Sequence, residues 1–218
     1  MKTVAIVSAN FGEIDYFHRH VEQDYAHDRA SFCEYNSPYP FPNLDNRTKS
    51  KFFKMQMHTL LEHDAFIWSD ASVEITDPTF VSTITRYLES YDMVNFTHPQ
   101  RKSVYAEIDY MIYEMTKGSH YLISRYGHQR LGLEKQFFME QGYPNNDVPL
   151  LCGFCFAVKN DAKCNAAFDE WWQRSLQFSN FDQNFLSYII WKHELRSKQL
   201  PSYDGMLVRH KHREVDWS

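Results

Sequence analysis

The stretch that decides the fold is residues 65–75, "AFIWSDASVEI". Five uncharged residues at 65–69 predict a buried strand, and Asp70 follows it directly. Val73 and Ile75 then alternate with polar residues, which predicts a second, short strand after a tight turn. The chain therefore places a carboxylate at the end of a buried strand, where ligands bind in open α/β sheets.

Strands and helices are predicted to alternate on both sides of this stretch. Apolar runs predict further strands at 3–9, 30–36, 92–98 and 149–158. Apolar residues at helical spacing predict helices at 13–26, 47–63, 80–88, 104–115, 133–142, 166–176 and 180–195. Asp77 and Pro78 are typical of the start of the third helix. The alternation predicts an α/β fold: one domain over residues 1–218, with a mostly parallel or mixed central sheet flanked by helices.

Composition excludes several classes of protein. The chain has 218 residues and a formal net charge of −5, which argues against a globally basic surface for nucleic acid. We find no run of transmembrane length and no signal peptide, so we expect a cytoplasmic protein with no membrane segment. Its four cysteines should then be reduced. "CGFC" at 152–155 lies in an apolar run, which favours strand packing over a metal or redox site.

Polar residues follow three of the predicted strands: Asn10–Gly12, Asp70 and His98. Parallel strands end at the same edge of a sheet, so we expect these residues to converge there. Asp70 could be a ligand of a divalent cation that bridges a diphosphate, with Ser72 near a water or a sugar hydroxyl. The alternative is a turn aspartate that bonds its own backbone.

A basic face is predicted on helix 47–63, where Arg47, Lys51, Lys54 and His58 recur at helical spacing. Three permanent cations on one face suit a polyanionic ligand such as a diphosphate. A solvated helix face is the alternative that spacing alone leaves open.

The segment "HPQRKSVYAEID" at 98–109 places His98 and Arg101 in a loop before Glu107 in a helix. Arg101 could pair with a phosphate, and Glu107 could bind a sugar hydroxyl or act as a general base. Ser103 and Glu107 could equally be ordinary residues of a first helical turn.

Asp182 in "SNFDQNF" (179–185) has two interpretations. Ser179 and Asp182 have the spacing of a capping box, which would account for the acid without any ligand. Trp171 and Trp172 lie shortly before it, and aromatic rings beside carboxylates are typical of sugar sites. Core packing is the expected alternative for at least one of the tryptophans.

The segment "RHKHR" at 209–213 carries two histidines two residues apart. In an extended chain His210 and His212 point to the same side. Either could complete a metal shell that begins at Asp70, and the alternative is a frayed basic tail.

In order along the chain, these motifs resemble a GT-A glycosyltransferase family long catalogued as a domain of unknown function, with plant and bacterial members. The resemblance covers residues 4 to about 190 and rests on "VSANFGEIDYF", "SKFFKMQMH", "FIWSDASVEI", "HPQRKSVYAEID" and "FDEWWQRSLQFSNFDQNFLSY". The chain is also similar to the N-terminal glycosyltransferase domain of chlorella-virus multidomain proteins that build the capsid glycan. This second resemblance implies a viral setting, with action in the host cytoplasm, and further domains in a longer chain.

The resemblance implies a UDP-sugar donor and Mn²⁺ or Mg²⁺ held by a DxD-like motif. Here that motif is degenerate, because Asp70 and Ala71 are followed by Ser72, so His210 or His212 is expected to help hold the metal. Catalytic roles are implied for Asp182, Glu107 and Asp70, and sugar or acceptor stacking for Trp171 and Trp172. The residues implied to bind the nucleotide sugar are Ser8, Ala9, Asn10, Phe11, Asp15, Lys51, Lys54, His58, Asp70, Ala71, Ser72, Arg101 and Gln183.

The expected activity is metal-assisted transfer of a sugar from a UDP-sugar to a glycan acceptor. L-rhamnose or a glucose-type hexose fits, and the resemblance favours a retaining course. Two alternatives remain open at this point: a metal-dependent nucleotide-sugar hydrolase or phosphodiesterase with Asp70, His98, His210 and His212 as its ligands, and a non-catalytic sugar-binding module.

Overall fold

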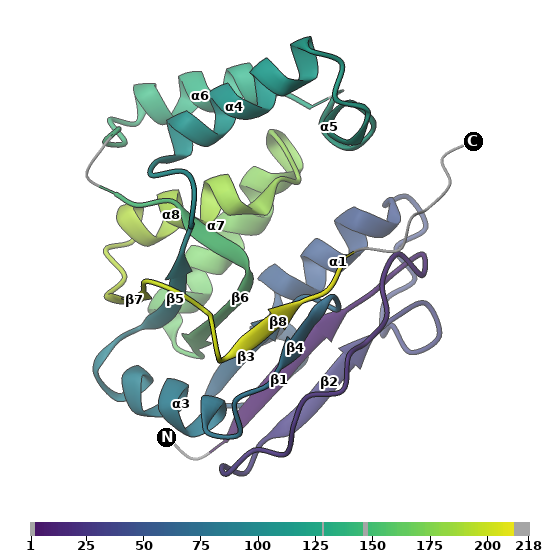
Figure 1. The fold of residues 1–218 in the computed structure, drawn as a ribbon, viewed down its shortest axis with the longest axis vertical. Helices are drawn as coiled ribbons and strands as arrows, with labels where there is room; N and C mark the ends of the chain where they lie inside the picture. Colours follow the sequence, from purple (N-terminus) through teal and green to yellow (C-terminus); the bar gives the residue numbers. More distant parts are fainter. Residues whose placement is uncertain (1–2, 128, 146–147, 212–218) are drawn as a thin grey trace.

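The computed structural model describes residues 3–127, 129–145 and 148–211. Its centre is a six-stranded sheet in the order β2-β1-β3-β6-β5-β7 (Figure 1). These strands are β1 (Val4–Ala9), β2 (Asp28–Phe32), β3 (Ala65–Ser69), β5 (Met93–Thr97), β6 (Leu151–Lys159) and β7 (Ser197–Leu200). β6 runs antiparallel to both of its neighbours and the other pairs are parallel, so the sheet is mixed. The predicted α/β fold with a central sheet between helices is confirmed.

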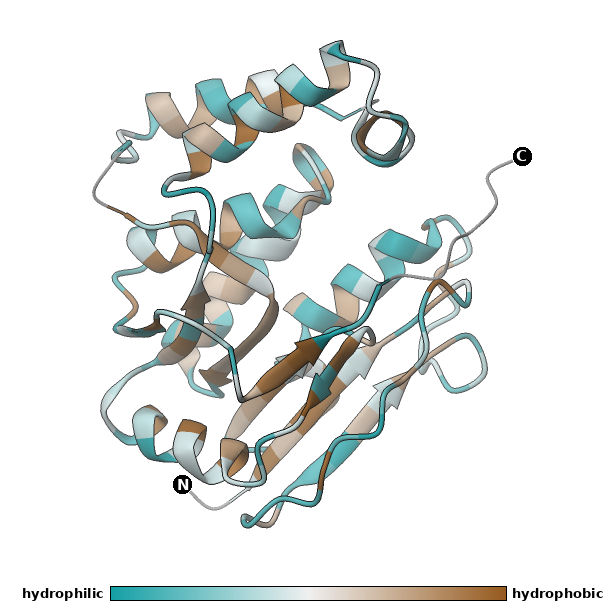
Figure 2. Cartoon of the chain, in the orientation of Figure 1, coloured by the Kyte–Doolittle hydropathy of each residue, from teal (hydrophilic) through white to brown (hydrophobic). Residues whose placement is uncertain are grey.

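Both faces of the sheet are buried, which explains why its central strands are apolar throughout. In β1, Ala5 and Val7 face one core, while Val4 and Ile6 face the other. β3 follows the same alternation, since Trp68 joins the first core and Ile67 the second. Figure 2 shows the apolar residues concentrated in these central strands.

Helices cover the first face in two layers. The helices next to the sheet are α1 (Asn46–Met55), α7 (Ala162–Gln177) and α8 (Asp182–Lys192), which contact β1, one another and β6. Beyond them lie α4 (Val104–Thr116), α5 (His120–Tyr126) and α6 (Leu131–Glu140), at the top of Figure 1. The second face is covered by α3 (Phe80–Ser90) and by an antiparallel ladder of β4 (Val73–Ile75) and β8 (Leu207–Arg209).

The predicted helix at 13–26 does not form. This segment has no helical hydrogen bonds and runs beside β4 and the start of α3. Val21 N–H donates to Ile75 O at 3.0 Å, and Asp24 N–H donates to Pro78 O at 2.9 Å. The segment buries little apolar surface, so backbone partners in β4 and at Pro78, just before α3, replace those that a helix would provide.

The predicted helix at 47–63 is interrupted. α1 ends at Met55, and a four-residue helix, α2 (Met57–Leu60), follows. Gln56 leaves helical geometry at φ −122°, and its side chain donates to Asp169 of α7 at 3.0 Å. The interruption turns the positions after Gln56 away from the basic face of α1.

Three elements escaped the sequence analysis: α5, β7 and β8 are short and lack a clear periodicity. The start of α3 also shifts. The helix begins at Phe80, and the carboxylate of Asp77 accepts from the backbone N–H of Thr79 at 2.8 Å. Within the described ranges, none of the helices combines the length and the apolar character needed to cross a membrane.

Candidate functional site

The ends of four strands meet at one edge of the central sheet. β1, β3 and β5 finish there, and antiparallel β6 begins there, with Ser69 opposite Cys155 and Thr97 opposite Leu151. Asp70 N–H extends the ladder by donating to Phe154 O at 2.8 Å. The predicted convergence of strand-end polar residues is confirmed, because Asp70 and His98 line the same cavity.

That cavity has a volume of about 390 Å³ and is rich in charge. The cations that line it are Lys51, Lys54, Arg101, Arg125 and Arg209. Two acids, Asp70 and Asp182, also line it. Charged residues from six separate parts of the chain therefore surround one space, and cations outnumber acids among the described residues that line it.

Lys54 lies between the two acids. Its ammonium forms ion pairs with the carboxylates of Asp182 and, at 3.0 Å, of Asp70. The Lys54 side chain is only 1% exposed, so both acids are needed to compensate a charge removed from water. Lys51, one turn earlier on α1, contacts the same Asp182 oxygen at 2.7 Å.

These contacts set the protonation states. Although burial alone would raise it, the pKa of Asp182 lies far below its usual range because Lys51 and Lys54 both contact the carboxylate. Burial alone would likewise lower the pKa of Lys54, but Asp182 and Asp70 raise it instead. Burial lowers the pKa of Lys51 to about 8; Asp182 opposes this shift and Lys54 adds to it. Lys51 is therefore the cation of this group whose charge is lost most readily.

Asp182 is held from several sides. It opens α8, where the indole N–H of Trp171 donates to its backbone carbonyl at 3.1 Å. A Cβ at Gly153 of β6 would come within 3.3 Å of an Asp182 oxygen, so the missing side chain makes room for the carboxylate. Its orientation toward the lysines, and not toward the helix terminus, argues against the capping-box interpretation.

Ser179, the other half of the expected capping box, contacts the buried Glu134 of α6. Its hydroxyl donates to Glu134 at 2.5 Å, and Asn184 of α8 donates to the other oxygen at 2.7 Å. Burial raises the pKa of Glu134 to about 8, so this carboxyl is mostly protonated at neutral pH. The result is a buried polar link that fixes the first turn of α8, and hence Asp182, to α6.

Asp70 owes its orientation to Trp68. Residues two apart on a strand share a face, and the Trp68 indole N–H donates to Asp70 Oδ1 at 2.6 Å. The backbone turn closes through Val73 N–H to Asp70 O at 2.9 Å. The alternative interpretation, that Asp70 is a turn residue, is thus correct for its backbone, whereas its side chain faces the cavity.

A second, smaller pocket of about 90 Å³ adjoins the first and shares Lys51, Asp70 and Arg125 with it. Among the residues predicted to bind the nucleotide, Ala9, Asn10, Phe11, Asp15 and Ala71 line this pocket. The loop from Asn10 to Asp15 is held in place by one of its own side chains, because Asn10 Nδ2 donates to Asp15 O at 2.7 Å.

Gly12 at the tip of this loop has a positive φ of 78°. The backbone conformation therefore favours glycine, and an added Cβ would also displace the Asn46 amide, which would lie 2.5 Å away.

Arg101 reaches the cavity, but Glu107 does not line it. Glu107 is buried in α4 and forms an ion pair with Arg101, which also stacks over Tyr110 at 4.3 Å. Ser103 caps α4 by accepting from Ala106 N–H at 3.2 Å, as the first-turn interpretation expects. Glu107 therefore positions Arg101, and this arrangement does not support its expected role as a base.

His98 is neutral in this environment. Burial and the charges of Arg101 and Arg209 lower its pKa to about 4. Its Nδ1 accepts from the backbone N–H groups of Arg101 at 3.0 Å and Gln100 at 3.2 Å, and its Nε2 lies 3.3 Å from the Arg101 guanidinium. His98 shapes the loop that presents Arg101, and this use of Nδ1 does not fit the metal cage of the hydrolase alternative.

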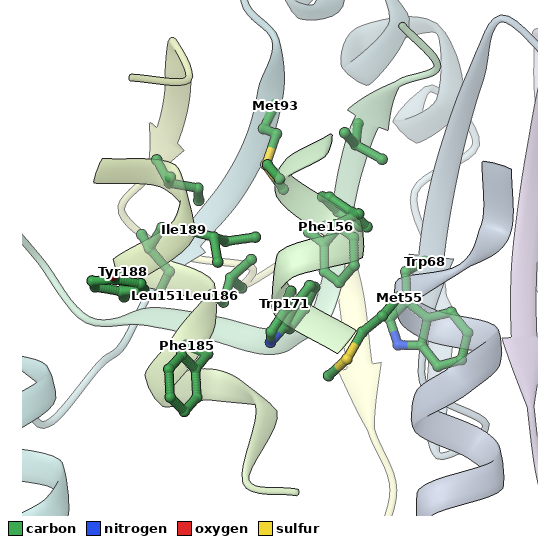
Figure 3. Close-up of a cluster of buried hydrophobic side chains, with 14 of the residues drawn as sticks. Met55, Trp68, Met93, Leu151, Phe156, Trp171, Phe185, Leu186, Tyr188 and Ile189 are labelled. Atoms are coloured by element: carbon green, nitrogen blue, oxygen red, sulfur yellow. The ribbon is translucent and has the colours of Figure 1, made fainter. Parts of the chain in front are cut away.

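The expected sugar-stacking role of Trp171 is wrong. Its side chain is fully buried among Phe156 and Phe168, and Figure 3 shows it inside this hydrophobic cluster. Trp172 is half-buried and packs edge-on against Phe52 at 5.4 Å, and it does not line the 390 Å³ cavity. The buried indole of Trp171 instead anchors Asp182.

Of the remaining residues predicted to bind the nucleotide sugar, some line the large cavity and others lie elsewhere. Gln183 lines the large cavity, whereas Ser8 lines a separate hollow of about 60 Å³. Ser72 is buried and lines neither of the two adjoining pockets, and its carbonyl accepts from His210 N–H at 2.8 Å. His58 contacts Asp169 at 3.1 Å and is not brought to the cavity, because α1 ends before it.

The predicted metal shell of Asp70, His210 and His212 is not assembled in the described part of the chain. His210 contacts Glu74 at 2.9 Å and stacks on His18, and Asp70 is engaged by Lys54 and Trp68. His212 lies outside the described residues.

The cysteines of "CGFC" pack within a strand: Cys152 and Cys155 are buried free thiols in β6, and burial raises the pKa of Cys152 to about 11.

The sequence analysis missed several residues of the cavity wall: Tyr121, Arg125 and Tyr126 of α5, Gly153 of β6, and Arg209 of β8. Arg209 stacks over Phe154 at 4.4 Å, and Arg125 lies 4.7 Å from the Tyr121 ring centroid. No local pattern in the sequence distinguishes these residues, because "RY" also occurs at Arg86–Tyr87, away from this cavity. No known family model and no curated protein matches this sequence.

Proposed function

We propose that this protein is a glycosyltransferase that takes a sugar from a UDP-sugar and transfers it to a glycan acceptor. The observation that carries the proposal is the cavity at the strand ends, where five cations surround two carboxylates beside a small pocket. A nucleoside diphosphate sugar has the matching parts: a base, two phosphates and a neutral sugar. The ordered motifs of the glycosyltransferase family supply the sugar-transfer part of the proposal.

The small pocket suits the uracil ring. Its volume of about 90 Å³ favours a single ring over a purine, and Phe11 and Ile14 provide apolar walls. The backbone of the Asn10–Asp15 loop can supply polar partners for the edge of the base. Lys51, Asp70 and Arg125 lie where the pocket opens into the larger cavity, which is the expected place for the diphosphate.

The chemical contribution of the site is electrostatic. Departure of UDP leaves negative charge on the β-phosphate, and preorganised cations lower the barrier by meeting that charge as it develops. Lys51, Arg125 and Arg101 line the cavity from three different elements. Lys54 is already compensated by Asp70 and Asp182, so we assign it the role of orienting these acids and the neighbouring Lys51.

Mn²⁺ or Mg²⁺, which the family resemblance implies, does not fit the described lining well. Hard cations prefer several free oxygen ligands. Here Asp182 contacts two ammonium groups, and Asp70 Oδ1 accepts from both Lys54 and Trp68. The proposed chemistry therefore relies on the cations of the protein, and metal assistance stays a prediction that UDP binding with Mn²⁺ or with EDTA tests.

A general base for an inverting reaction would have to be a free carboxylate in the cavity. Asp182 has a strongly lowered pKa and is paired with lysines, which makes it a weak base. Glu107 is paired with Arg101 outside the cavity. These pairings favour the retaining course, in which the departing phosphate accepts the acceptor's proton. The protein then needs only to position the acceptor sugar, and this holds whether the donor carries L-rhamnose or a glucose-type hexose.

Melting temperatures in the presence of nucleotides test the proposal. A ligand that binds only the folded state raises stability by mass action, about 2.7 kcal/mol at a hundred times Kd. We expect UDP and UDP-hexoses to raise the melting temperature more than UMP, uridine or ADP. Lys51→Ala should abolish most of the shift, while Lys49→Ala, on the same helix but outside both pockets, should keep it.

The same titration with Mn²⁺ or with EDTA measures whether a metal contributes. No shift with UDP or any UDP-sugar would overturn the proposal. Product analysis separates the alternatives, because a hydrolase releases UMP and sugar phosphate rapidly, and a sugar-binding module responds to glycans but not to nucleotides. The four cysteines are free thiols, which supports a cytoplasmic setting.

A further inference from the structure

A cluster of metal-ligating side chains lies outside the cavity, and the proposed function does not use it. His18, Glu74 and His210 each offer one ligand atom, and these atoms all lie within 4.8 Å of one another. The three residues come from the 10–27 segment, from β4 and from the residue after β8. All three side chains are half-buried.

The register of the small ladder explains why Glu74 and His210 meet. Val73 and Ile75 face the core, so Glu74 between them points outward. Glu74 lies opposite Val208, and His210 is two residues further on the same strand face. The backbone N–H of His210 donates to Ser72 O at 2.8 Å, so this pairing continues past β8.

His18 is brought to the same face by the extended path of its segment. Val21 N–H donates to Ile75 O at 3.0 Å, and His20 Nδ1 accepts from Ile75 N–H at 3.0 Å. These two bonds fasten residues 20 and 21 to Ile75 of β4. The His18 ring then lies parallel to His210, with ring centroids 3.7 Å apart.

We propose that His18, Glu74 and His210 form a binding site for a zinc-type divalent cation. Two imidazoles and one carboxylate are a common ligand set for Zn²⁺, with water in the fourth position. His210 Nε2 and Glu74 Oε2 are 2.9 Å apart, which is hydrogen-bond distance. Tetrahedral ligands at ordinary zinc distances lie about 3.4 Å apart, so metal binding requires a small opening of this pair and a tilt of the two stacked rings that turns their nitrogens toward one ion.

The consequence of metal binding would be structural. One ion would connect the irregular 10–27 segment to β4 and to the chain after β8, which are far apart in sequence. Residues 10–15 of the same segment border the small pocket. The inference stands independently of the proposed transferase activity, because none of the three ligands lines the 390 Å³ or the 90 Å³ pocket.

The test is metal titration of the full chain after treatment with EDTA and removal of the chelator. We expect wild type to bind one equivalent of Zn²⁺ in calorimetry, and Co²⁺ to give the visible absorption of a low-coordinate site. Glu74→Gln, His18→Ala and His210→Ala should each weaken binding at least about tenfold. His63→Ala is the matched control, because His63 also pairs with a carboxylate, Asp28 at 2.8 Å, but without a third ligand.

Glu74→Gln decides the outcome if the alanine variants unfold. Its amide oxygen still accepts a hydrogen bond from His210, so a cluster that is only hydrogen-bonded survives the change, whereas a metal site loses its charged ligand. Zn²⁺ should raise the melting temperature of wild type and of His63→Ala, but not of Glu74→Gln. Absence of saturable one-to-one binding by wild type, or equal affinity in Glu74→Gln, overturns the proposal.

Discussion

The ammonium of Lys54 contacts the carboxylate of Asp182 across 128 residues of sequence. This contact joins the end of α1 to the start of α8 beneath the cavity. Lys54 also contacts Asp70 at 3.0 Å, so one buried cation fixes two acids from different elements. Removal of one partner of such a group leaves uncompensated buried charge, which costs far more than an exposed ion pair contributes.

Lys54→Met should therefore lower the free energy of unfolding by about 3–5 kcal/mol, as expected for a broken buried pair. Lys51→Met should cost less, because Asp182 still forms its ion pair with Lys54. The Lys51 side chain is also more exposed, at 16%. Urea unfolding curves measure both values. Lys135→Met is the control: its pair with Asp109 is exposed, and its loss should cost at most about 1 kcal/mol. A cost for Lys54→Met as small as that of the control would contradict this assignment.

The sequence predicted the sheet better than its surroundings. Strands β1, β3, β5 and β6 are long apolar runs buried on both faces, so their positions depend on composition alone. The 13–26 segment showed helical spacing, but its backbone bonds with Ile75 of β4 and with Pro78 determine its path. Those partners are distant in sequence, and no local sequence pattern predicts them.

The candidate site was also predictable only where a local pattern in the sequence marked its residues. Lys51, Lys54, Asp70 and Asp182 stood out as charges beside apolar periodicity or a strand end, and the fold brings them together. Trp171 was misjudged because burial depends on which helix face meets the sheet. Arg125 and Gly153 acquire their roles only through tertiary contacts, with α5 over the cavity and β6 against Asp182.

Gly153→Ala tests the close fit between β6 and Asp182. The added Cβ would lie 3.3 Å from Asp182 Oδ2 and 3.5 Å from its Cγ, so the carboxylate must shift by a few tenths of an ångström. We expect stability to change by no more than about 1 kcal/mol, because glycine-to-alanine changes at tolerant positions have effects of that size. UDP binding measured by calorimetry should weaken, since the positions of Lys51 and Lys54 depend on Asp182.

Gly132→Ala serves as its control, because a Cβ there meets no atom within 4 Å. Equal UDP affinity in Gly153→Ala and wild type would show that the position of Asp182 is unimportant for binding.

Glu134→Gln should change the pH dependence of stability. The folded-state pKa of Glu134 is raised to about 8 from 4.5, so the folded protein keeps a proton that the unfolded chain releases. Stability from this group is present below pH 4.5 and is lost as the pH rises toward 8. The variant is neutral at every pH, and its amide can still accept from Asn184 and donate to Ser179. Its stability relative to wild type should therefore rise between pH 5 and pH 8.

Urea unfolding at a series of pH values measures this difference. Glu140→Gln, at the exposed end of α6, should show no comparable trend. A constant difference between wild type and Glu134→Gln across that range would mean that Glu134 is ionised in the fold.

Arg125→Ala should weaken UDP binding with little effect on folding. Arg125 lines both pockets and belongs to the seven-residue helix α5, of which Tyr126 is the buried residue. Loss of one cation beside a diphosphate should lower affinity by about tenfold or more, since hydrogen bonds to charged groups contribute about 1.5–3 kcal/mol. The effect should shrink for UMP, which has one phosphate, and at high salt. Arg174→Ala, which loses a cation over Phe137 away from both pockets, is the matched control. Equal losses for UDP and UMP would place Arg125 beside the nucleoside and not beside the diphosphate.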